Sequence, residues 1–139
     1  MKKILIVLAD YYSDISLSLL KSAKSNLNNF SLKVIRVPGV FEIPVTISKN
    51  IKKYDAFLAL GCVIKGETPH FDFISKSSTD ALMDLSIQFK KPIGNGILTC
   101  LNMKQAKARK KKGSEAAKAV ISVLSQKWKL LLVQEITQE

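Results

Sequence analysis

The residues best suited to chemistry lie in one stretch of the chain, residues 61–73 (GCVIKGETPHFDF). His70 is the only histidine, and histidine is the side chain that most readily gains and loses a proton near neutral pH. Thr68 and Pro69 fit the N-cap and the first position of a following helix, where free backbone amides favour an anion. The stretch therefore predicts a phosphorylated substrate on the amides around Glu67 and Thr68, beside a histidine that transfers protons.

Each candidate residue also has an interpretation without a catalytic role. His70 could be a solvated residue of the first helical turn. Glu42 could complement a helix dipole rather than bind hydroxyl groups. Tyr11 or Tyr12 could stack on a planar heterocycle, or either could be a half-buried aromatic residue of a loop. We do not expect Glu67 to act as an acid, because an anion-binding loop disfavours its charge, so its backbone is the more suitable group.

Several well-known catalytic and nucleotide-binding motifs are absent from the sequence. The chain contains no GxGxxG, no GxxxxGK[ST] and no GxSxG. Cys62 and Cys100 fall at the ends of separate predicted strands without the spacing of a metal site, so we expect no metal and a reduced, cytoplasmic protein. No apolar run approaches the ~20 residues of a membrane-spanning helix, so no membrane interaction is expected.

The composition fits one globular domain, residues 1–139, with a basic surface. Hydrophobic residues make up 47% of the chain, which is enough for a core. The 22 Lys and Arg residues against 11 Asp and Glu give a net charge of +11, which could indicate binding to nucleic acid. Because the basic residues are spread along the chain apart from residues 107–112, and few aromatic residues accompany them, we favour a solvated lysine-rich surface without nucleic acid.

Strands and helices are predicted to alternate along the chain. Apolar runs predict strands at residues 3–9, 31–37, 54–60 and 91–99. Helices are expected from Ser13 or Asp14, from Phe41 or Glu42, after Pro69, from Asn102 to about 111, and over 114–132 after a break at Gly113. The inner face of the helix after Pro69 is expected to carry Phe73, Ile74, Ser77, Ala81, Leu82 and Leu85.

Such alternation implies a parallel sheet with helices on both faces and right-handed crossovers. The loops at residues 10–13, 39–42, 62–70 and 95–100 then follow the carboxyl ends of the strands. Ligands bind at this edge in sheets of this kind, so we expect the candidate residues to converge there.

Three segments together resemble one enzyme family. Residues 37–44 (VPGVFEIP), 59–72 (ALGCVIKGETPHFD) and 96–99 (GILT) occur in the same order as in 6,7-dimethyl-8-ribityllumazine synthases. The resemblance extends from about residue 3 to residue 124. It agrees with an α/β fold of three α/β/α layers, with a four-stranded parallel sheet and flavodoxin-like winding.

The resemblance implies a condensation reaction in riboflavin biosynthesis. The 5-amino group of 5-amino-6-(D-ribitylamino)uracil attacks the ketone of 3,4-dihydroxy-2-butanone 4-phosphate and gives an imine. Phosphate is then eliminated, and ring closure with loss of water gives the lumazine. The family implies no cofactor, and it implies a functional link to riboflavin synthase.

The resemblance also implies roles for individual residues. His70 matches the catalytic histidine, and Tyr11 matches the aromatic residue that stacks on the pyrimidine. Glu67, Thr68 and Arg109 match the phosphate-binding positions. The positions that hold the ribityl and pyrimidine groups are matched by Val40, Phe41, Glu42, Cys62, Val63, Ile64 and Asn95. In this family the site lies between subunits, with Asn95 and Arg109 supplied by the neighbour, so a homopentamer is implied.

Three features depart from the family pattern. Asn95 stands where many members carry Phe, the segment between Arg109 and Gly113 is short and lysine-rich, and residues 127–139 run past the usual end. The apolar residues 130–133 suggest an interface, and the absence of an N-terminal extension favours a free pentamer over a larger shell. Two alternatives stay open: a non-catalytic protein of the same fold that binds a flavin or lumazine, and a nucleic-acid-binding module.

Overall fold

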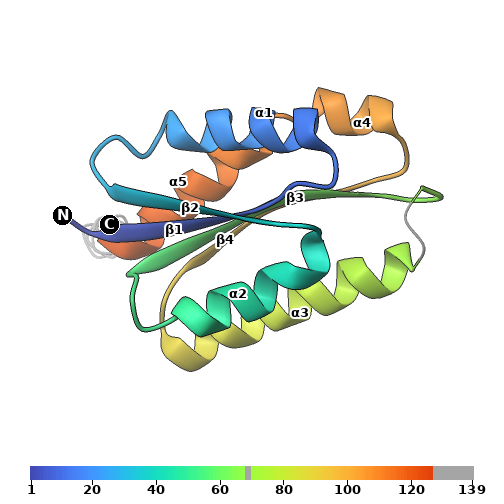
Figure 1. Ribbon diagram of the computed structural model, residues 1–139. Coiled ribbons are helices and arrows are strands. Elements are labelled where there is room, and N and C mark those ends of the chain that lie inside the picture. Colours follow the sequence, from blue (N-terminus) through green and yellow to red (C-terminus); the bar gives the residue numbers. More distant parts are fainter. Residues whose placement is uncertain (68–69, 127–139) are drawn as a thin grey trace, which may run out of the picture.

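The computed structural model describes residues 1–67 and 70–126 of the chain. Within them, strands and helices alternate as predicted (Figure 1). In chain order the elements are β1 (Lys3–Ala9), α1 (Ser13–Lys24), β2 (Ser31–Val37), the short 3-10 helix η1 (Val40–Glu42), α2 (Ile43–Asn50), β3 (Ala56–Ile64), α3 (Phe71–Phe89), β4 (Ile93–Cys100), α4 (Met103–Ala108) and α5 (Lys112–Ser125). No helix in this part of the chain is long and apolar enough to cross a membrane.

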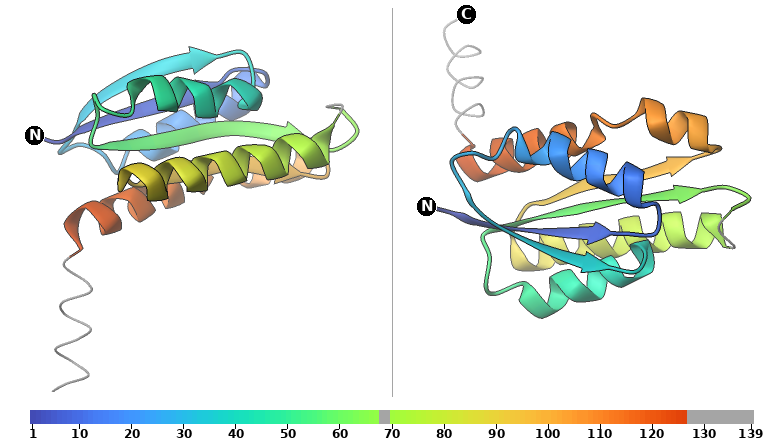
Figure 2. Two further views of the ribbon diagram at one scale, coloured as in Figure 1. Left: turned by 90° about the horizontal axis from the view of Figure 1, so that it is seen from below. Right: turned by 45° about the horizontal axis from the view of Figure 1, so that its top comes forward.

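The four strands form one parallel sheet in the order β2-β1-β3-β4. Helices α1, α4 and α5 cover one face of the sheet, and α2 and α3 cover the other face (Figure 1). The view from below in Figure 2 shows α2 and α3 lying across the near face of the strands. The predicted three-layer α/β/α architecture with flavodoxin-like winding is confirmed.

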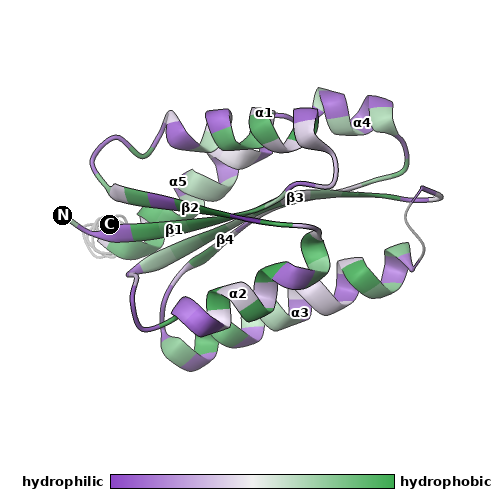
Figure 3. Cartoon of the chain, in the orientation of Figure 1, coloured by the Kyte–Doolittle hydropathy of each residue, from purple (hydrophilic) through white to green (hydrophobic). Residues whose placement is uncertain are grey.

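Two hydrophobic cores separate the sheet from its helical layers. The central strands β1 and β3 are buried on both faces, which explains their nearly unbroken apolar sequences. Successive side chains alternate between the faces, so Ile6 and Leu8 pack toward α1 and α5, whereas Leu5 and Val7 pack toward α2 and α3. Figure 3 shows these hydrophobic strands between helices that carry the hydrophilic residues.

The third strand is longer than predicted. β3 continues to Ile64 rather than ending at Leu60, because residues 61–64 stay paired with β4 as far as Cys100. Gly61 and Cys62 therefore belong to a buried strand and not to a loop. The loop after β3 therefore begins after Ile64, at the carboxyl edge of the sheet where the other strands also end.

The third helix begins later than predicted. Its first residue is Phe71, and His70 occupies the N-cap position, so the expected cap by Thr68 is wrong. Thr68 and Pro69 themselves lie outside the described residues. The predicted inner face is also partly wrong, because Phe73 and Ser77 are exposed. The residues turned toward the sheet recur at three- and four-residue spacing from the first residue of the helix. They are Phe71, Ile74, Ser78, Leu82, Leu85 and Phe89.

Two of the other predicted helix starts, those of α1 and α4, have different outcomes. α1 begins at Ser13 with Tyr12 at its N-cap position and without a side-chain cap, so the expected cap by Ser13 or Asp14 is wrong. Asn102 caps α4 as predicted, because its Oδ1 accepts a hydrogen bond of 2.9 Å from the Gln105 backbone N–H. The Gln105 side chain in return accepts from the Leu101 N–H at 2.8 Å, which fixes the turn from β4 into α4.

Gly113 does not break the last helix. α5 begins at Lys112, and a Cβ atom on Gly113 would lie 2.1 Å from the carbonyl oxygen of Leu19, so glycine allows α5 to pack closely on α1. α5 ends at Ser125, where the prediction continued to residue 132, and Gln126 follows in the left-handed conformation with φ 49°. Residues 127–139, including the apolar residues 130–133, lie outside the described residues.

Candidate active site

One cavity at the carboxyl edge of the sheet brings together most of the residues predicted for the site. Its volume is about 360 Å³, and we call it the aromatic cavity. It is formed by the loop after β1, the segment around η1, the end of β3 and the start of α3. Its lining residues are Tyr11, Gly39, Val40, Phe41, Glu42, Cys62, Val63, His70 and Ile74. Apart from Gly39 and Ile74, all of them are among the predicted site residues.

The close approach of η1 to β3 depends on Gly61. A Cβ atom at this position would lie 2.9 Å from Ala9 Cβ and 2.9 Å from Val40 Cγ2, closer than Cβ atoms normally come. Because glycine leaves this space open, Val40 is buried against the strand. The following residues, Phe41 and Glu42, are thereby held at the opening of the cavity.

Two aromatic rings remain largely exposed at this opening. Tyr11 is 63% exposed and Phe41 is 70% exposed in the single chain. Tyr11 and Tyr12 form a T-shaped pair with a distance of 4.8 Å between ring centroids, and most of the Tyr11 ring stays open to solvent. An exposed aromatic face beside a carboxylate suits a planar heterocycle that carries hydroxyl groups.

Tyr12 does not line the aromatic cavity. Its ring packs against the hydrophobic core on the α1 side of the sheet, and its hydroxyl donates a hydrogen bond of 3.2 Å to the Glu67 carboxylate. This bond joins the loop after β1 to the loop after β3. Of the two tyrosines that the sequence left as alternatives, Tyr11 is therefore the one placed to meet a ligand in this cavity.

His70 lies at the start of α3 in an unusual backbone conformation. Its φ of 65° and ψ of 32° are left-handed, a region that few residues other than glycine adopt. Its carbonyl oxygen accepts a hydrogen bond of 2.9 Å from the Ile74 N–H, which ties it to the first turn of the helix. The ring is exposed and lies 6.1 Å from the Phe73 ring between centroids. Strained backbone of this kind is often found at functional sites.

Cys62 is present in the aromatic cavity as a neutral thiol. The pKa of Cys62 is raised from 9.0 to about 12, mainly by burial, and the neighbouring Cys100 thiol and the Glu67 charge contribute in the same direction. A thiol with this pKa stays protonated at neutral pH and is a poor nucleophile. Both cysteines are free, and the described residues contain no group of three or more His, Cys, Asp or Glu that could hold a metal ion.

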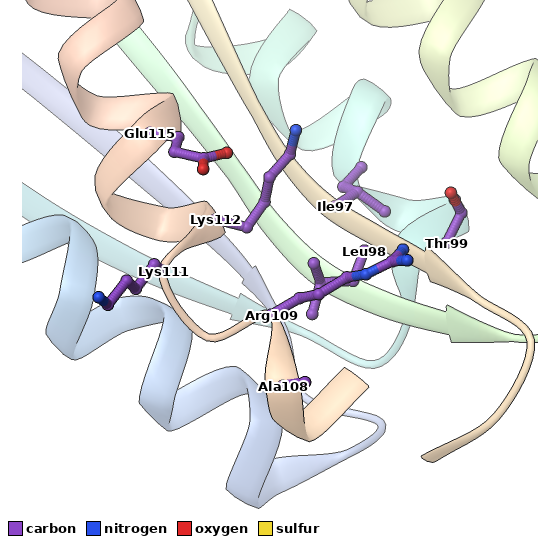
Figure 4. A pocket seen from close by; sticks show the side chains of 8 residues that line it. All are labelled: Ile97, Leu98, Thr99, Ala108, Arg109, Lys111, Lys112 and Glu115. Atoms are coloured by element: carbon purple, nitrogen blue, oxygen red, sulfur yellow. The ribbon is translucent and has the colours of Figure 1, made fainter. Parts of the chain in front are cut away.

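A second cavity lies beside β4, between this strand and the α4–α5 turn. Its volume is about 460 Å³, and we call it the basic cavity. Figure 4 shows Arg109 extending along β4 toward Thr99, with Lys112 beside it and Lys111 pointing away from both. The lining residues are Ile97, Leu98, Thr99, Ala108, Arg109, Lys111, Lys112 and Glu115. No residue is shared with the aromatic cavity.

Three further predicted site residues lie in neither cavity. Asn95 is exposed on β4, and its Oδ1 accepts a hydrogen bond of 3.1 Å from the Ile97 N–H. Ile64 is buried at the end of β3, and Glu67 is exposed in the loop that follows. Thr68 lies outside the described residues. One chain therefore gathers the predicted ring-binding residues except Ile64 and Asn95 in one place and Arg109 in another.

The sequence did not assign the other residues of the basic cavity. Lys112 belongs to the short lysine-rich segment after Arg109 and Thr99 to the GILT segment of the family resemblance, but neither of them nor Glu115 receives a role from the sequence. The signal that could have found Lys112 and Glu115 is their place in the first turn of α5. It was missed because Gly113 was interpreted as a helix breaker instead of a close-packing residue.

Comparison with known proteins shows the family of the chain. A family model described as 6,7-dimethyl-8-ribityllumazine synthase matches residues 1–127. The chain belongs to this family. A protein of this name from Agrobacterium fabrum is 45% identical over 141 residues, which cover 91% of this chain and 95% of the relative. The protein of the same name from Nitrobacter hamburgensis is 43% identical over 140 residues, covering 91% of this chain and 86% of the relative.

A third lumazine synthase, from Bartonella bacilliformis, is 45% identical over 135 residues and covers 89% of each chain. The family match over residues 1–127 includes every lining residue of the aromatic cavity and of the basic cavity. Both cavities thus belong to the part of the chain that is common to lumazine synthases. Residues 128–139 lie beyond the match.

Proposed function

We infer that this chain is a 6,7-dimethyl-8-ribityllumazine synthase that acts in riboflavin biosynthesis. The observation that carries the inference is the family match across residues 1–127, which contains both cavities. The proposed substrates are 5-amino-6-(D-ribitylamino)uracil and 3,4-dihydroxy-2-butanone 4-phosphate. We place the activity in the cytoplasm, and its product is then the substrate of riboflavin synthase.

In this proposal the aromatic cavity holds the aminouracil. Tyr11 stacks on the pyrimidine ring, and the Glu42 carboxylate accepts hydrogen bonds from ribityl hydroxyl groups. Val40 and Val63 supply apolar walls, and Cys62 contributes a neutral thiol. The cavity thus binds and orients the ring. Because the Cys62 thiol stays neutral, it does not act as a nucleophile beside the substrate amine.

The reaction forms two carbon–nitrogen bonds and requires several proton transfers. The 5-amino group adds to the ketone and loses one water to give the imine, and phosphate then leaves as a neighbouring carbon loses a proton. The ribitylamino nitrogen then attacks the carbonyl carbon that remains from the butanone. This step closes the second ring and releases another water. Of the side chains that line the aromatic cavity, His70 is the one suited to accept and donate protons near neutral pH.

The phosphate group of the second substrate is assigned to Arg109 and Lys112 of the basic cavity, together with the backbone around Glu67 and Thr68 of an adjacent subunit. Arginine binds phosphate through paired N–H donors, and lysine adds a point charge. Because the two cavities of one chain share no residue, we propose that each active site combines the aromatic cavity of one subunit with the basic cavity of its neighbour.

The surface of the single chain supports an assembly of this kind. Large hydrophobic side chains are exposed on η1, α2 and α3, namely Phe41, Val45, Phe73, Met83 and Ile87. Apolar surface of this extent usually marks an interface. A heterologous contact that repeats around a ring would cover it and complete every site in the same way, and we propose a homopentamer.

The activity is tested by mixing the purified, chelator-treated protein with both substrates and following the absorbance of the lumazine. We expect turnover well above the uncatalysed condensation, with phosphate released in equal amount. A protein that binds the lumazine but does not accelerate its formation would show instead the non-catalytic binding function. The assembly is tested separately by light scattering, where an active monomer would contradict the shared site.

A further inference from the structure

Three lysines on or just after α4 lie close in sequence to the residues of the basic cavity but do not line it. Lys104 and Lys107 lie on α4, and Lys110 follows Arg109 in the turn before α5. All three side chains are exposed, and none contributes to the cavity wall. We call these three lysines the basic collar. Glu115 is the only acidic residue between residues 104 and 118, so the local charge is strongly positive.

The charges of the collar are not neutralised within the described part of the chain. The ion pairs there are Arg36 with Asp10 and Lys76 with Asp80, both far from α4 in sequence. Lys107 does line a small cavity of about 210 Å³ together with Asp14, but the two side chains form no ion pair. The collar therefore presents open positive charge to the solvent around the basic cavity.

The collar is close enough to act on an anion in the basic cavity. Because a helix rises about 1.5 Å per residue, Lys104 and Lys107 begin within about 8 Å of Arg109 along the direction of α4. Interactions over such distances are effective at low ionic strength and are screened when the Debye length falls to a few ångströms. Direct hydrogen bonds from Arg109 are much less sensitive to salt than this long-range attraction.

We propose that the basic collar attracts the phosphorylated substrate electrostatically and lowers its KM in a salt-dependent manner. This inference rests on the proposed function for the identity of the substrate. The phosphate monoester carries nearly two negative charges at neutral pH, whereas the aminouracil is uncharged and serves as an internal reference. The collar thus adds long-range attraction for one substrate only, and Arg109 and Lys112 make the direct contacts.

A small phosphate ester fits these observations better than a nucleic acid. The collar residues adjoin a cavity of about 460 Å³, which suits a single compact anion. The segment from residue 103 to residue 126 contains no aromatic residue, so it offers no surface on which bases could stack. A small anion that enters the cavity also contacts Arg109 and Lys112. A polymer bound across the surface would not have to contact these two side chains.

The test compares two triple variants with the same change of net charge. K104Q/K107Q/K110Q removes the collar, and K49Q/K52Q/K53Q removes three exposed lysines at and after the end of α2, which leads to the opposite edge of the sheet. At about 0.02 M ionic strength we expect the collar variant to raise the KM of the phosphorylated substrate about 5- to 10-fold, or about twofold per lysine. In about 0.5 M sodium chloride the difference should fall below about twofold.

The KM of the aminouracil and kcat should be unchanged in the collar variant, and the control variant should match the wild type. Titration with inorganic phosphate, followed by calorimetry, gives a second measurement that does not depend on turnover, and the collar variant should lose phosphate affinity by a similar factor. Unchanged KM and unchanged phosphate affinity would overturn the proposal. So would a collar variant that loses binding of a short RNA while its KM stays the same. An inactive wild type that still binds phosphate through the collar would contradict the proposed function and not the collar.

Discussion

The two cavities of this chain differ in the elements that build them and in the chemistry of the side chains that line them. The aromatic cavity is built by β1, η1, β3 and α3, and it presents exposed rings, apolar walls, one carboxylate and one histidine. The basic cavity is built by β4, α4 and α5, and Arg109, Lys111 and Lys112 give it a positive charge. Both follow the carboxyl ends of the strands, yet they have no lining residue in common.

This difference matches the different binding needs of the two proposed substrates. A heterocycle needs stacking surfaces and hydrogen-bond acceptors, whereas a phosphate ester needs fixed positive charge. Changes in the aromatic cavity should therefore affect the chemical step or the KM of the aminouracil, and changes in the basic cavity should affect the KM of the phosphate ester.

The largest expected effect comes from His70→Ala. The variant should lower kcat about 100-fold, near the lower end for a general acid–base residue, because imine formation also proceeds slowly without a catalyst. The KM values of both substrates should change little, since His70 moves protons and does not hold either substrate. Steady-state kinetics across neutral pH provides the measurement. Wild-type kcat in the variant would remove His70 from the mechanism and weaken the distinction between the cavities.

Arg109→Ala should act on binding of the phosphate ester. We expect its KM to rise about 10- to 100-fold, because a hydrogen bond to a charged group contributes about 1.5–3 kcal/mol. The KM of the aminouracil should stay the same, and Arg109→Lys should restore part of the loss, because it keeps the charge but not the paired donors. If Lys110→Ala raises this KM more than Arg109→Ala does, the assignment of the phosphate contact to Arg109 is wrong.

Mixing the two variants tests whether the cavities of different subunits form one site. Neither variant alone should be efficient at low concentrations of the phosphate ester. When equal amounts are unfolded and refolded together, about one quarter of the sites in a heterologous ring should combine an intact His70 with an intact Arg109. Activity at low concentrations of the phosphate ester should then rise about 25-fold above that of His70→Ala, and about 2.5- to 25-fold above that of Arg109→Ala, depending on how far Arg109→Ala raises the KM. No recovery in mixed oligomers, confirmed by native mass spectrometry, would place both residues of a site on one chain.

Much of the fold and part of the site could be predicted from the sequence. The bounds of β1 and β2 agree with prediction, because each strand is an apolar or alternating run that ends at clear turn residues. The rule that ligands bind at the carboxyl ends of parallel strands correctly brought together Tyr11, Glu42 and His70. These features depend on local pattern and on topology alone.

The features that the sequence did not predict depend on tertiary contacts. Thr68 and Pro69 have the local pattern of a helix start, but α3 begins at Phe71 and leaves His70 left-handed. Gly113 has the local pattern of a helix breaker, but the nearby carbonyl of Leu19 explains it as a packing residue. The contact between the two cysteine thiols likewise follows from the register of β3 with β4, which neither strand specifies by itself.

The smallest expected effect concerns the neutral thiol in the aromatic cavity. Burial raises the pKa of Cys62 from 9.0 to about 12, so below about pH 9 the thiol is protonated in both the folded and the unfolded chain. Above that pH the unfolded chain loses the proton while the folded chain keeps it, so folding stability falls as the pH rises toward 12.

Denaturant unfolding of the wild type and of Cys62→Ala, compared between about pH 8 and pH 10, measures this contribution. The stability of the wild type should fall more steeply than that of Cys62→Ala, by less than about 1.4 kcal/mol per pH unit, which is the limit for one proton. Lysines and tyrosines titrate in both proteins, so only the difference in slope is informative. Iodoacetamide should modify Cys62 slowly in the folded protein and rapidly after unfolding. Equal slopes together with rapid modification of the folded protein would show a thiolate in the aromatic cavity, and this cavity would then contain a second reactive group beside His70.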